Sequence, residues 1–309
     1  MEATVQKGAS GFGLGRIESI SRVDGGLSND MWRVRSGEGD FAVKIMRAHA
    51  TAPRFRENIE SAFEIELNAF RSGVPCPEPR PTPEGRALLR VDGCWLRAHR
   101  WRDGSTPAVG EHLDAAGDLL ARVHRAGHET TLPLEDRPIG PRRWAELAEL
   151  PALPGPLSDQ LRTAAPALAQ LESRTLTRSG RPAVLVDSHG DLDPKNALLT
   201  EGKLLAVDWD AAGPRSPARE AISLALDWSH DIAGFRRALA AYSESSGRTI
   251  PAEPWVFGGW VDGMSGWLAY NAEQRARTAL GEREVTAACT RLLTLHRALD
   301  EHVTALVTI

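Results

Sequence analysis

The most constraining feature of this chain is the segment HGDLDPKNALLTEGKLLAVDWD, which spans residues 189–210. It contains two short apolar runs, ALLT and KLLAV, joined by Glu201-Gly202. A two-residue connection of this kind is typical of a tight antiparallel hairpin. The segment therefore predicts a small hairpin that is preceded by a loop rich in carboxylates.

The register of this hairpin decides which polar side chains meet. If Thr200 pairs with Lys203 across the turn, Asn196 falls beside Asp208 at the other end of the two strands. Asp191 lies just ahead of Asn196 on the same loop. The hairpin is therefore predicted to gather one amide and two carboxylates at one end of a small sheet.

This set of side chains matches the needs of phosphoryl transfer. A carboxylate and an amide oxygen can hold Mg²⁺, a hard cation that prefers oxygen ligands. A separate carboxylate can orient an attacking hydroxyl and accept its proton. The plainer interpretation is a loop whose acids only cap and solvate the hairpin. The combined spacing, with Asn five residues after the His-x-Asp and Asp twelve residues after that Asn, favours the catalytic interpretation.

Length and composition leave room for such an enzyme and exclude other classes. The 309 residues suffice for two lobes, and 42% hydrophobic with 25% charged residues is ordinary for a soluble globular protein. A net charge of −4 provides no general attraction to nucleic acid or to anionic membranes. Three scattered cysteines without C-x-x-C spacing argue against a disulfide framework or a zinc site, and for a reducing compartment.

The first residues, MEATVQKGASGFGLGRIES, lack the apolar stretch of a signal peptide, and no window approaches the ~18 apolar residues of a membrane span. We therefore expect a cytoplasmic protein without a membrane partner, and both a monomer and a homodimer stay open. The GFGLGR run has no preceding strand, and its glycines are misplaced for a dinucleotide fingerprint. We expect it to be a flexible lead-in.

Residues 17–100 are mostly strand-like, with one helical interruption. MWRVR and FAVKIM flank the turn sequence SGEGD, and pairing Arg35 with Asp40 gives an apolar face and a basic face that includes Lys44. Between residues 57 and 71, apolar side chains recur at helical spacing. This part of the chain therefore predicts a small antiparallel sheet with one helix.

The remainder of the chain is predicted to be mainly helical. The helical patterns cover residues 111–128, 219–245 and 255–307, and a loop with one short helix covers residues 133–156. The change from strands to helices places a boundary near residues 100–104. We therefore expect two regions, residues 1–100 and residues 101–309.

The motifs HGDLDPKN and LLAVDWD resemble the catalytic signature of the aminoglycoside phosphotransferase and choline kinase families, which are relatives of the protein kinases. The resemblance runs from about Ile17 to the C-terminal helices and is most specific between His189 and Asp210. It implies an α+β, bilobal protein-kinase-like fold. The N-lobe would hold a small antiparallel β-sheet with one helix, and the larger C-lobe would be mainly helical. ATP and Mg²⁺ are the implied cofactors.

The resemblance also implies roles for the residues of the motif. Asp191 would be the catalytic base, and Asn196 and Asp208 would be Mg²⁺ ligands. His189 would brace the loop by hydrogen bonds. Asp210, the second acid of the DWD sequence, would support the site or join the metal site.

One departure from the family pattern concerns Asp193. Many members carry His at this position, two residues after the catalytic Asp, and protein kinases carry Lys. A carboxylate here would repel the γ-phosphate unless it turns away or is paired, and Lys195 is the nearest residue that could supply positive charge. Asp193 could instead contact the substrate or cap the loop, and the sequence leaves these alternatives open.

The first lobe would cover the nucleotide. By resemblance, Lys44 in FAVKIM is the strand lysine that pairs with the α- and β-phosphates. A helix glutamate would hold this lysine, with Glu64 as the expected residue and Glu60 as the alternative. The backbone amides of the loop DGGLSNDMW would approach the phosphates, and the loop residues expected at the nucleotide are Gly25, Gly26, Ser28 and Asn29.

The adenine and acceptor sites are implied less directly. The segment LRAHRW would be the linker between the lobes, where backbone groups of Ala98, His99 and Arg100 could contact adenine. The helices after Asp210 would form the acceptor pocket, and the candidates there are Asp227, Asp262 and Glu273. The chain lacks an A-P-E segment and a long activation loop, which argues against a protein acceptor.

The resemblance thus implies a kinase that transfers the γ-phosphate of MgATP to a hydroxyl group of a small molecule. Family acceptors include aminoglycosides, other antibiotics and amino-alcohols. One alternative is a nucleotide-binding pseudokinase with a regulatory role, and another is a binding protein whose acids hold a structural cation. The identity of the acceptor and the choice between ATP and GTP stay open.

Overall fold

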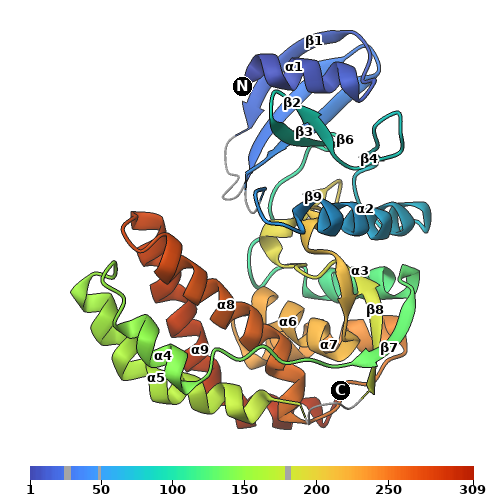
Figure 1. Cartoon of the computed structure of the whole chain (residues 1–309). Helices are drawn as coiled ribbons and strands as arrows, with labels where there is room; N and C mark the ends of the chain where they lie inside the picture. Colours follow the sequence, from blue (N-terminus) through green and yellow to red (C-terminus); the bar gives the residue numbers. More distant parts are fainter. Residues whose placement is uncertain (24–28, 48–49, 178–181) are drawn as a thin grey trace. The chain divides into compact units, whose positions relative to one another are not determined.

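The structure is a computed structural model, and it describes residues 1–23, 29–47, 50–177 and 182–309. These residues form two units. The first contains Met1–His128 and Val186–Pro214, and the second contains Glu129–Leu185 and Arg215–Ile309. Figure 1 labels the larger helices and most of the strands. The α+β class predicted above is confirmed, with an antiparallel sheet early in the chain and mainly helices later.

An antiparallel sheet forms the first half of the first unit. Its strands run in the order β1-β2-β3-β6-β4, and β5 pairs with β6. The strands are β1 (Ile17–Val23), β2 (Asp30–Ser36), β3 (Gly39–Met46), β4 (Pro79–Arg80), β5 (Leu89–Val91) and β6 (Cys94–Arg100). The predicted register of the β2–β3 hairpin is confirmed, because Arg35 pairs with Asp40 and Met31 pairs with Lys44.

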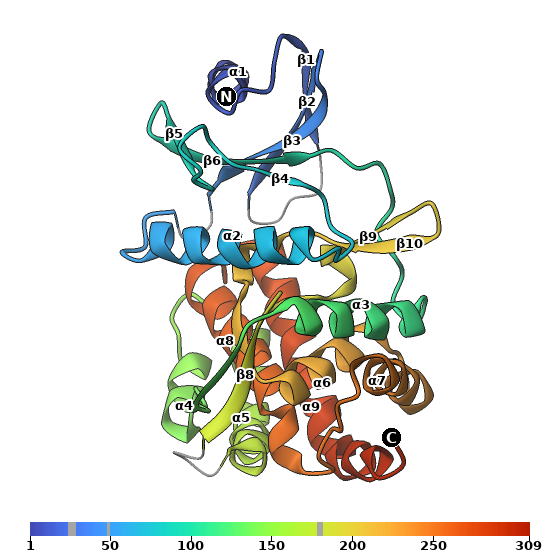
Figure 2. The same cartoon turned by 90° about the vertical axis from the view of Figure 1, so that its right-hand side faces the viewer.

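The two faces of this sheet have different partners. Val34, Phe41, Val43 and Ile45 are fully buried on one face, where they pack with residues of helix α1 (Glu2–Gly11). Because successive strand residues point to opposite faces, Lys44 and Met46 lie on the other face. There Met46 packs with apolar residues of helix α2 (Phe55–Arg71). In Figure 2 the two helices lie on opposite sides of the sheet.

The N-terminal segment corrects one expectation. The GFGLGR run is not a flexible lead-in, because Phe12 and Leu14 belong to the buried cluster under α1. Gly13 and Gly15 have positive φ values of 65° and 81°. These left-handed conformations suit glycine and let the chain turn from the helix toward β1.

A second, smaller hairpin carries the predicted catalytic segment. It consists of β9 (Ala197–Thr200) and β10 (Lys203–Ala206), and Thr200 pairs with Lys203 as predicted. Glu201 and Gly202 both have positive φ values, 48° and 76°, as a tight turn between twisted strands requires. The short helices η1 (Pro194–Asn196) and η2 (Trp209–Ala211) lie just before and just after the hairpin, and helix α3 (Leu113–Ala126) completes the unit.

The second unit is mainly helical. Its helices are α4 (Pro141–Ala148), α5 (Gly155–Thr175), α6 (Pro217–Trp228), α7 (Ile232–Ser246), η3 (Pro254–Phe257), α8 (Gly258–Gln274) and α9 (Ala279–Leu306). Strand β7 (Glu129–Pro133) belongs to this unit, whereas β8 (Pro182–Ser188) and β11 (Gly213–Arg215) each have residues in both units. In the described part of the chain, no helix has the length and apolar character needed to span a membrane.

The bounds of the two units differ from the regions 1–100 and 101–309 drawn from the sequence. The segment after residue 100 stays with the first unit, because Ser105 exchanges two backbone hydrogen bonds with Leu199 of β9, at 3.1 and 2.8 Å. The first unit therefore contains both the sheet with Lys44 and the loop with Asp191.

Candidate active site

The small hairpin brings Asn196 and Asp208 together as the register predicted. The backbone N–H of Val207 donates to the carbonyl of Asn196 at 2.9 Å, so Val207 lies opposite Asn196 and Asp208 is the next residue. Asp208 has a φ of 64°, a left-handed conformation that is uncommon for a residue with a side chain. Strained backbone of this kind is typical of functional sites.

His189 holds the loop that carries Asp191. Its Nδ1 accepts a hydrogen bond from the backbone N–H of Asp191 at 3.3 Å, and its Nε2 lies 3.0 Å from the carbonyl of Val207. A carbonyl can only accept, so Nε2 carries the proton and the ring is the neutral tautomer. The ring is fully buried and packs on Trp209, with centroids 4.7 Å apart. His189 thus braces the loop against the end of the hairpin, as predicted.

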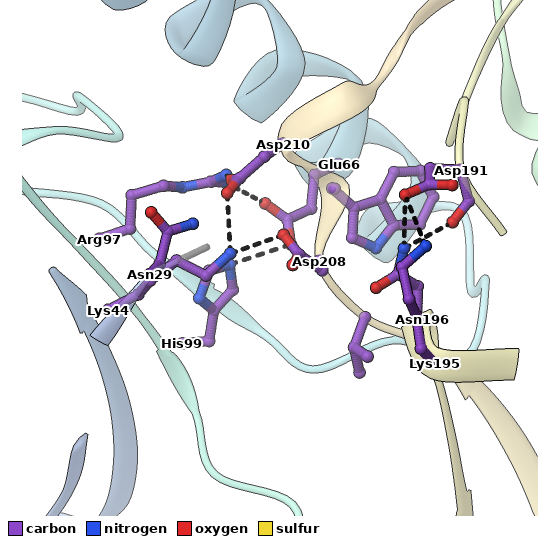
Figure 3. A network of polar contacts seen from close by, with 12 residues as sticks. Asn29, Lys44, Glu66, Arg97, His99, Asp191, Lys195, Asn196, Asp208 and Asp210 are labelled. Carbon is purple, nitrogen blue, oxygen red and sulfur yellow. Dashed lines mark hydrogen bonds and ion pairs between the residues drawn. The ribbon is translucent and has the colours of Figure 1, made fainter. Parts of the chain in front are cut away.

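Asp191 and Asn196 are joined directly. The amide nitrogen of Asn196 donates to the carboxylate Oδ2 and to the backbone carbonyl of Asp191, each at 2.8 Å (Figure 3). The amide oxygen of Asn196 is therefore turned away from Asp191. The Asp191 side chain is 46% exposed, which leaves it accessible to a reacting group.

The contacts of Asp193 show which of the roles left open by the sequence it has in the loop. The carboxylate of Asp193 accepts from the backbone N–H of Asn196 at 3.2 Å and forms an ion pair with Lys195. Lys195 also lies 3.6 Å from Asp191. Asp193 therefore caps helix η1 and is neutralised by Lys195, so it does not add an unpaired negative charge to the loop.

Lys44 lies on the inner side of β3 and is almost completely buried. Its Nζ binds Asp208 Oδ1 at 2.6 Å and Asp210 Oδ2 at 2.8 Å. Burial acts to lower the pKa of Lys44, but the charges of Asp210 and Asp208 outweigh it and raise the pKa above its ordinary value. Lys44 is therefore a charged ammonium at neutral pH, placed against two carboxylates of the DWD sequence.

The glutamate partner expected for Lys44 is corrected by the structure. The side chain of Glu64 is exposed, and Glu60 accepts from the backbone N–H groups of Ala87 and Leu88 at 2.9 and 3.2 Å. Glu66, on the other flank of α2, points inward and is buried. The partners of Lys44 are therefore aspartates at the end of the hairpin, and the buried Glu66 of α2 binds a different cation.

That cation is Arg97 of β6, a residue that the sequence analysis missed. Its guanidinium donates from Nη2 to Glu66 at 2.5 Å and from Nη1 to Asp210. His99 Nε2 lies 3.0 Å from the other oxygen of Glu66. Figure 3 shows Arg97 between the two acids, next to Lys44. The available signal was the alternation of LRAHR, which puts Arg97 and His99 on the face opposite the buried Leu96 and Ala98.

The pKa values of the acids follow from these contacts. Burial works to raise the pKa of Asp210, yet Lys44 and Arg97 together hold it well below its usual range. Burial likewise opposes ionisation of Glu66, but His99 and Arg97 lower its pKa. Both acids are therefore charged. Because each oxygen of Asp210 is bonded to a different cation, its geometry favours the supporting role over direct metal ligation.

The expected linker at Ala98, His99 and Arg100 is part of β6 instead. Ala98 pairs with Val43 on one side and Arg80 on the other, and the Arg100 N–H donates to the Glu78 carbonyl at 2.8 Å. The backbone groups of this stretch are used within the sheet, so the expectation that they contact adenine is not supported. The irregular connection begins after this strand.

The loop expected at the phosphates is described only at its end. Gly25, Gly26 and Ser28 lie outside the described residues. Asn29 is drawn in Figure 3, and its Oδ1 accepts from the backbone N–H of Arg47 at 2.8 Å.

The acceptor candidates lie in the second unit, and each has a partner there. Asp227 on α6 accepts from the indole N–H of Trp260 at 2.9 Å and pairs with Arg291. Asp262 on α8 accepts from the backbone N–H of Arg137 at 2.9 Å, and burial raises its pKa. Glu273, also on α8, pairs with Arg143. These contacts account for the three acids as structural residues of the unit, and a role in binding an acceptor stays a proposal.

The donor set at the hairpin end fits a divalent cation that is shared with phosphate. Asp208 has a side chain that is 43% exposed, and Asn196 adds an amide oxygen beside it. Among the described residues, no group of three or more His, Cys, Asp or Glu side chains forms a metal cage. One carboxylate and one amide suit Mg²⁺, which keeps several waters and uses substrate phosphates as ligands.

Solved structures with the same arrangement of elements define the fold as protein-kinase-like. The choline kinase LicA from Streptococcus pneumoniae has a TM-score of 0.65 at 15% identity and covers 95% of this chain and 99% of its own. The amicoumacin kinase hAmiN, solved with AMP-PNP, Ca²⁺ and Ami, has a TM-score of 0.64 at 13% identity, with 95% and 93% covered. At these identities the likeness concerns the fold alone.

Residues 19–256 match the phosphotransferase enzyme family known as APH, and the chain belongs to this family. Among curated proteins, the homoserine kinase of Methylobacillus glycogenes is 24% identical over 152 residues, which are 48% of this chain and 44% of the relative. The match thus spans less than half of that relative's length. Family membership confirms the resemblance on which the residue roles above were based.

Proposed function

We propose that this protein is an ATP-dependent kinase that phosphorylates a hydroxyl group of a small molecule. The observation that carries the proposal is the end of the small hairpin, where Asp191, Asn196 and Asp208 stand in one unit with the buried cation Lys44. Membership of a phosphotransferase family supports the same reaction class. Catalysis of this kind needs positioning and charge neutralisation rather than covalent chemistry by the protein.

Each residue of the site has a distinct task in this proposal. Asp191 orients the acceptor hydroxyl and takes its proton, and His189 and Asn196 hold it in place. Asn196 and Asp208 are the oxygen donors for Mg²⁺, which when bound would neutralise charge on the triphosphate. Lys44 supplies a fixed positive charge for the nucleotide phosphates, and Lys195 offsets Asp193 at the mouth of the loop.

We favour a small amino-alcohol as the acceptor. The support is that the curated relatives are named homoserine kinases, while two structural neighbours are named for choline and amicoumacin. These names describe the relatives. Homoserine and choline are both small alcohols that carry a positively charged nitrogen. Asp227, Asp262 and Glu273 are the acids that we retain as candidates for contact with such a cation. Antibiotics, including aminoglycosides, are a further acceptor class within the proposal.

The proposal is tested by release of the nucleoside diphosphate, ADP from ATP or GDP from GTP, in the presence of Mg²⁺. The acceptor panel contains homoserine, choline, ethanolamine and representative aminoglycosides, and each reaction is repeated with Asp191→Ala. We expect turnover with one acceptor class and its loss in the variant. Tight MgATP binding without turnover on a broadened panel would favour the pseudokinase alternative. Absence of both binding and turnover in the folded protein would refute the proposal.

A further inference from the structure

Two buried cations lie side by side in the first unit. Lys44 of β3 and Arg97 of β6 are directly paired in the sheet register, and they are 5% and 2% exposed. Like charges on paired strand residues repel each other, more strongly when both are removed from water. Their coexistence requires acids, and these are Glu66, Asp208 and Asp210.

The two cations divide the carboxylate of Asp210 between them. Lys44 binds Oδ2 at 2.8 Å, and Arg97 Nη1 binds Oδ1. The other terminal nitrogen of Arg97 binds Glu66, whose second oxygen meets His99. A planar guanidinium can span two acids that lie apart in this way, whereas a lysine ammonium carries its three donors on one nitrogen.

This division has a consequence for the proposed reaction. Lys44 is bound to Asp208 and Asp210. When Lys44 also serves the phosphates, its hold on these acids weakens, and a partly buried carboxylate left without a cation is unfavourable. Asp210 then keeps a cationic partner, because Arg97 holds its other oxygen.

We propose that Arg97 is a positioning residue that neutralises Asp210, so that Lys44 can serve the nucleotide. Glu66 of α2 in turn fixes the guanidinium of Arg97. The buried glutamate of α2 thus acts on the DWD acids through Arg97 and not through Lys44. This inference rests on the function proposed above.

The test compares Arg97→Gln, Arg97→Lys and the double variant Glu66→Gln with Arg97→Gln. Arg35→Gln is the matched control, because Arg35 is an exposed strand arginine of the same sheet that faces an aspartate. Melting temperature is measured on nucleotide-free protein, and the Kd of MgATP is measured by calorimetry.

We expect Arg97→Gln to lower the melting temperature by roughly 10 °C and to raise the Kd of MgATP by about tenfold or more. Arg97→Lys should recover part of the affinity. The double variant should regain much of the melting temperature, since it removes the uncompensated Glu66, while its Kd stays high because Asp210 still retains Lys44. Arg35→Gln should change neither quantity. A double variant that recovers both stability and affinity would overturn the inference, because Arg97 would then be purely structural.

A second measurement separates this inference from the proposed function. A double-mutant cycle of Arg97→Gln and Asp210→Asn, followed by urea unfolding of nucleotide-free protein, reports their coupling without any ligand. We expect the two changes to be clearly non-additive. Additive effects would contradict the inference even if the wild type is an active kinase. If the cycle shows strong coupling but the wild-type protein binds no MgATP, the result would instead contradict the proposed function.

Discussion

Asp191 stands on a loop whose conformation depends on a single neutral histidine. His189 accepts from the Asp191 N–H and donates to the Val207 carbonyl, so it ties the loop to the residue just before Asp208. The same ring packs on Trp209, which follows Asp208. One buried side chain therefore helps to position both the proposed base and the proposed metal-binding acid.

We expect His189→Ala to lower the free energy of unfolding by about 2–4 kcal/mol, because it removes two hydrogen bonds and leaves a cavity beside Trp209. Turnover should fall as well, since Asp191 loses its support. Urea unfolding and ADP release measure the two effects. His230→Ala, at an exposed position, is the control, and an equal loss of stability in both variants would contradict the role of His189.

At the scale of elements, helix α2 is attached to the sheet through an acid that is three turns from its start. Glu66 is 1% exposed and bonded to Arg97 and His99 of β6, while Glu64 on the opposite flank is exposed. The two glutamates lie two residues apart on the same helix, so they form a matched pair for mutagenesis.

Glu66→Gln should destabilise the protein by about 3–5 kcal/mol, because it leaves Arg97 buried with one acid fewer. Glu64→Gln should change stability by less than about 0.5 kcal/mol and leave turnover unchanged, as surface substitutions usually do. Chemical denaturation measures the stability of each variant, and ADP release measures its turnover. If Glu64→Gln abolished MgATP binding while Glu66→Gln did not, the result would support Glu64 as the partner of Lys44, as first expected from the family resemblance.

The buried acids also set a pH dependence for the first unit. The pKa values of Glu66 and Asp210 are lowered in the folded protein, so the unfolded chain takes up these protons first as the pH falls. Their contribution is complete above the ordinary carboxyl pKa of about 4 and is lost as the pH falls from about 5 toward the folded-state values. The urea midpoint should therefore drop steadily below pH 5.

Asp210→Asn should make this drop smaller, because the variant has one fewer acid with a lowered pKa. Glu301→Gln, an exposed acid on α9, serves as the control and should follow the wild type. Identical pH profiles for Asp210→Asn and the wild type would show that Asp210 titrates normally in the folded protein.

At the scale of the whole molecule, local rules predicted the two hairpins and the meeting of Asn196 with Asp208 at the end of one of them. Alternation of apolar residues and two-residue turns fixed both registers, and the register alone brought Asn196 to Asp208. The spacing around His189 then indicated the reaction class, since few other chemistries need an acid, an amide and a second acid in that order.

The polar network of Lys44, Arg97 and their acids could not be predicted from such rules. Arg97 meets Glu66 across 31 positions and Asp210 across 113, and no local pattern reports contacts of that separation. The choice of Glu64 failed because both flanks of α2 carry glutamates, and only the packed structure shows which flank faces the sheet. Helix α1 was missed for a similar reason, since it is held by tertiary packing of Phe12 and Leu14 rather than by helix propensity.

The most direct test of the central claim is a paired measurement on Asp191→Asn, using the acceptor that the panel identifies. We expect turnover to fall by about 10²–10⁴-fold, as for the loss of a general base, while the Kd of MgATP stays within about threefold of the wild type. Near-normal turnover in this variant would contradict the claim that Asp191 is the catalytic base. So would the loss of MgATP binding in a variant whose melting temperature matches that of the wild type.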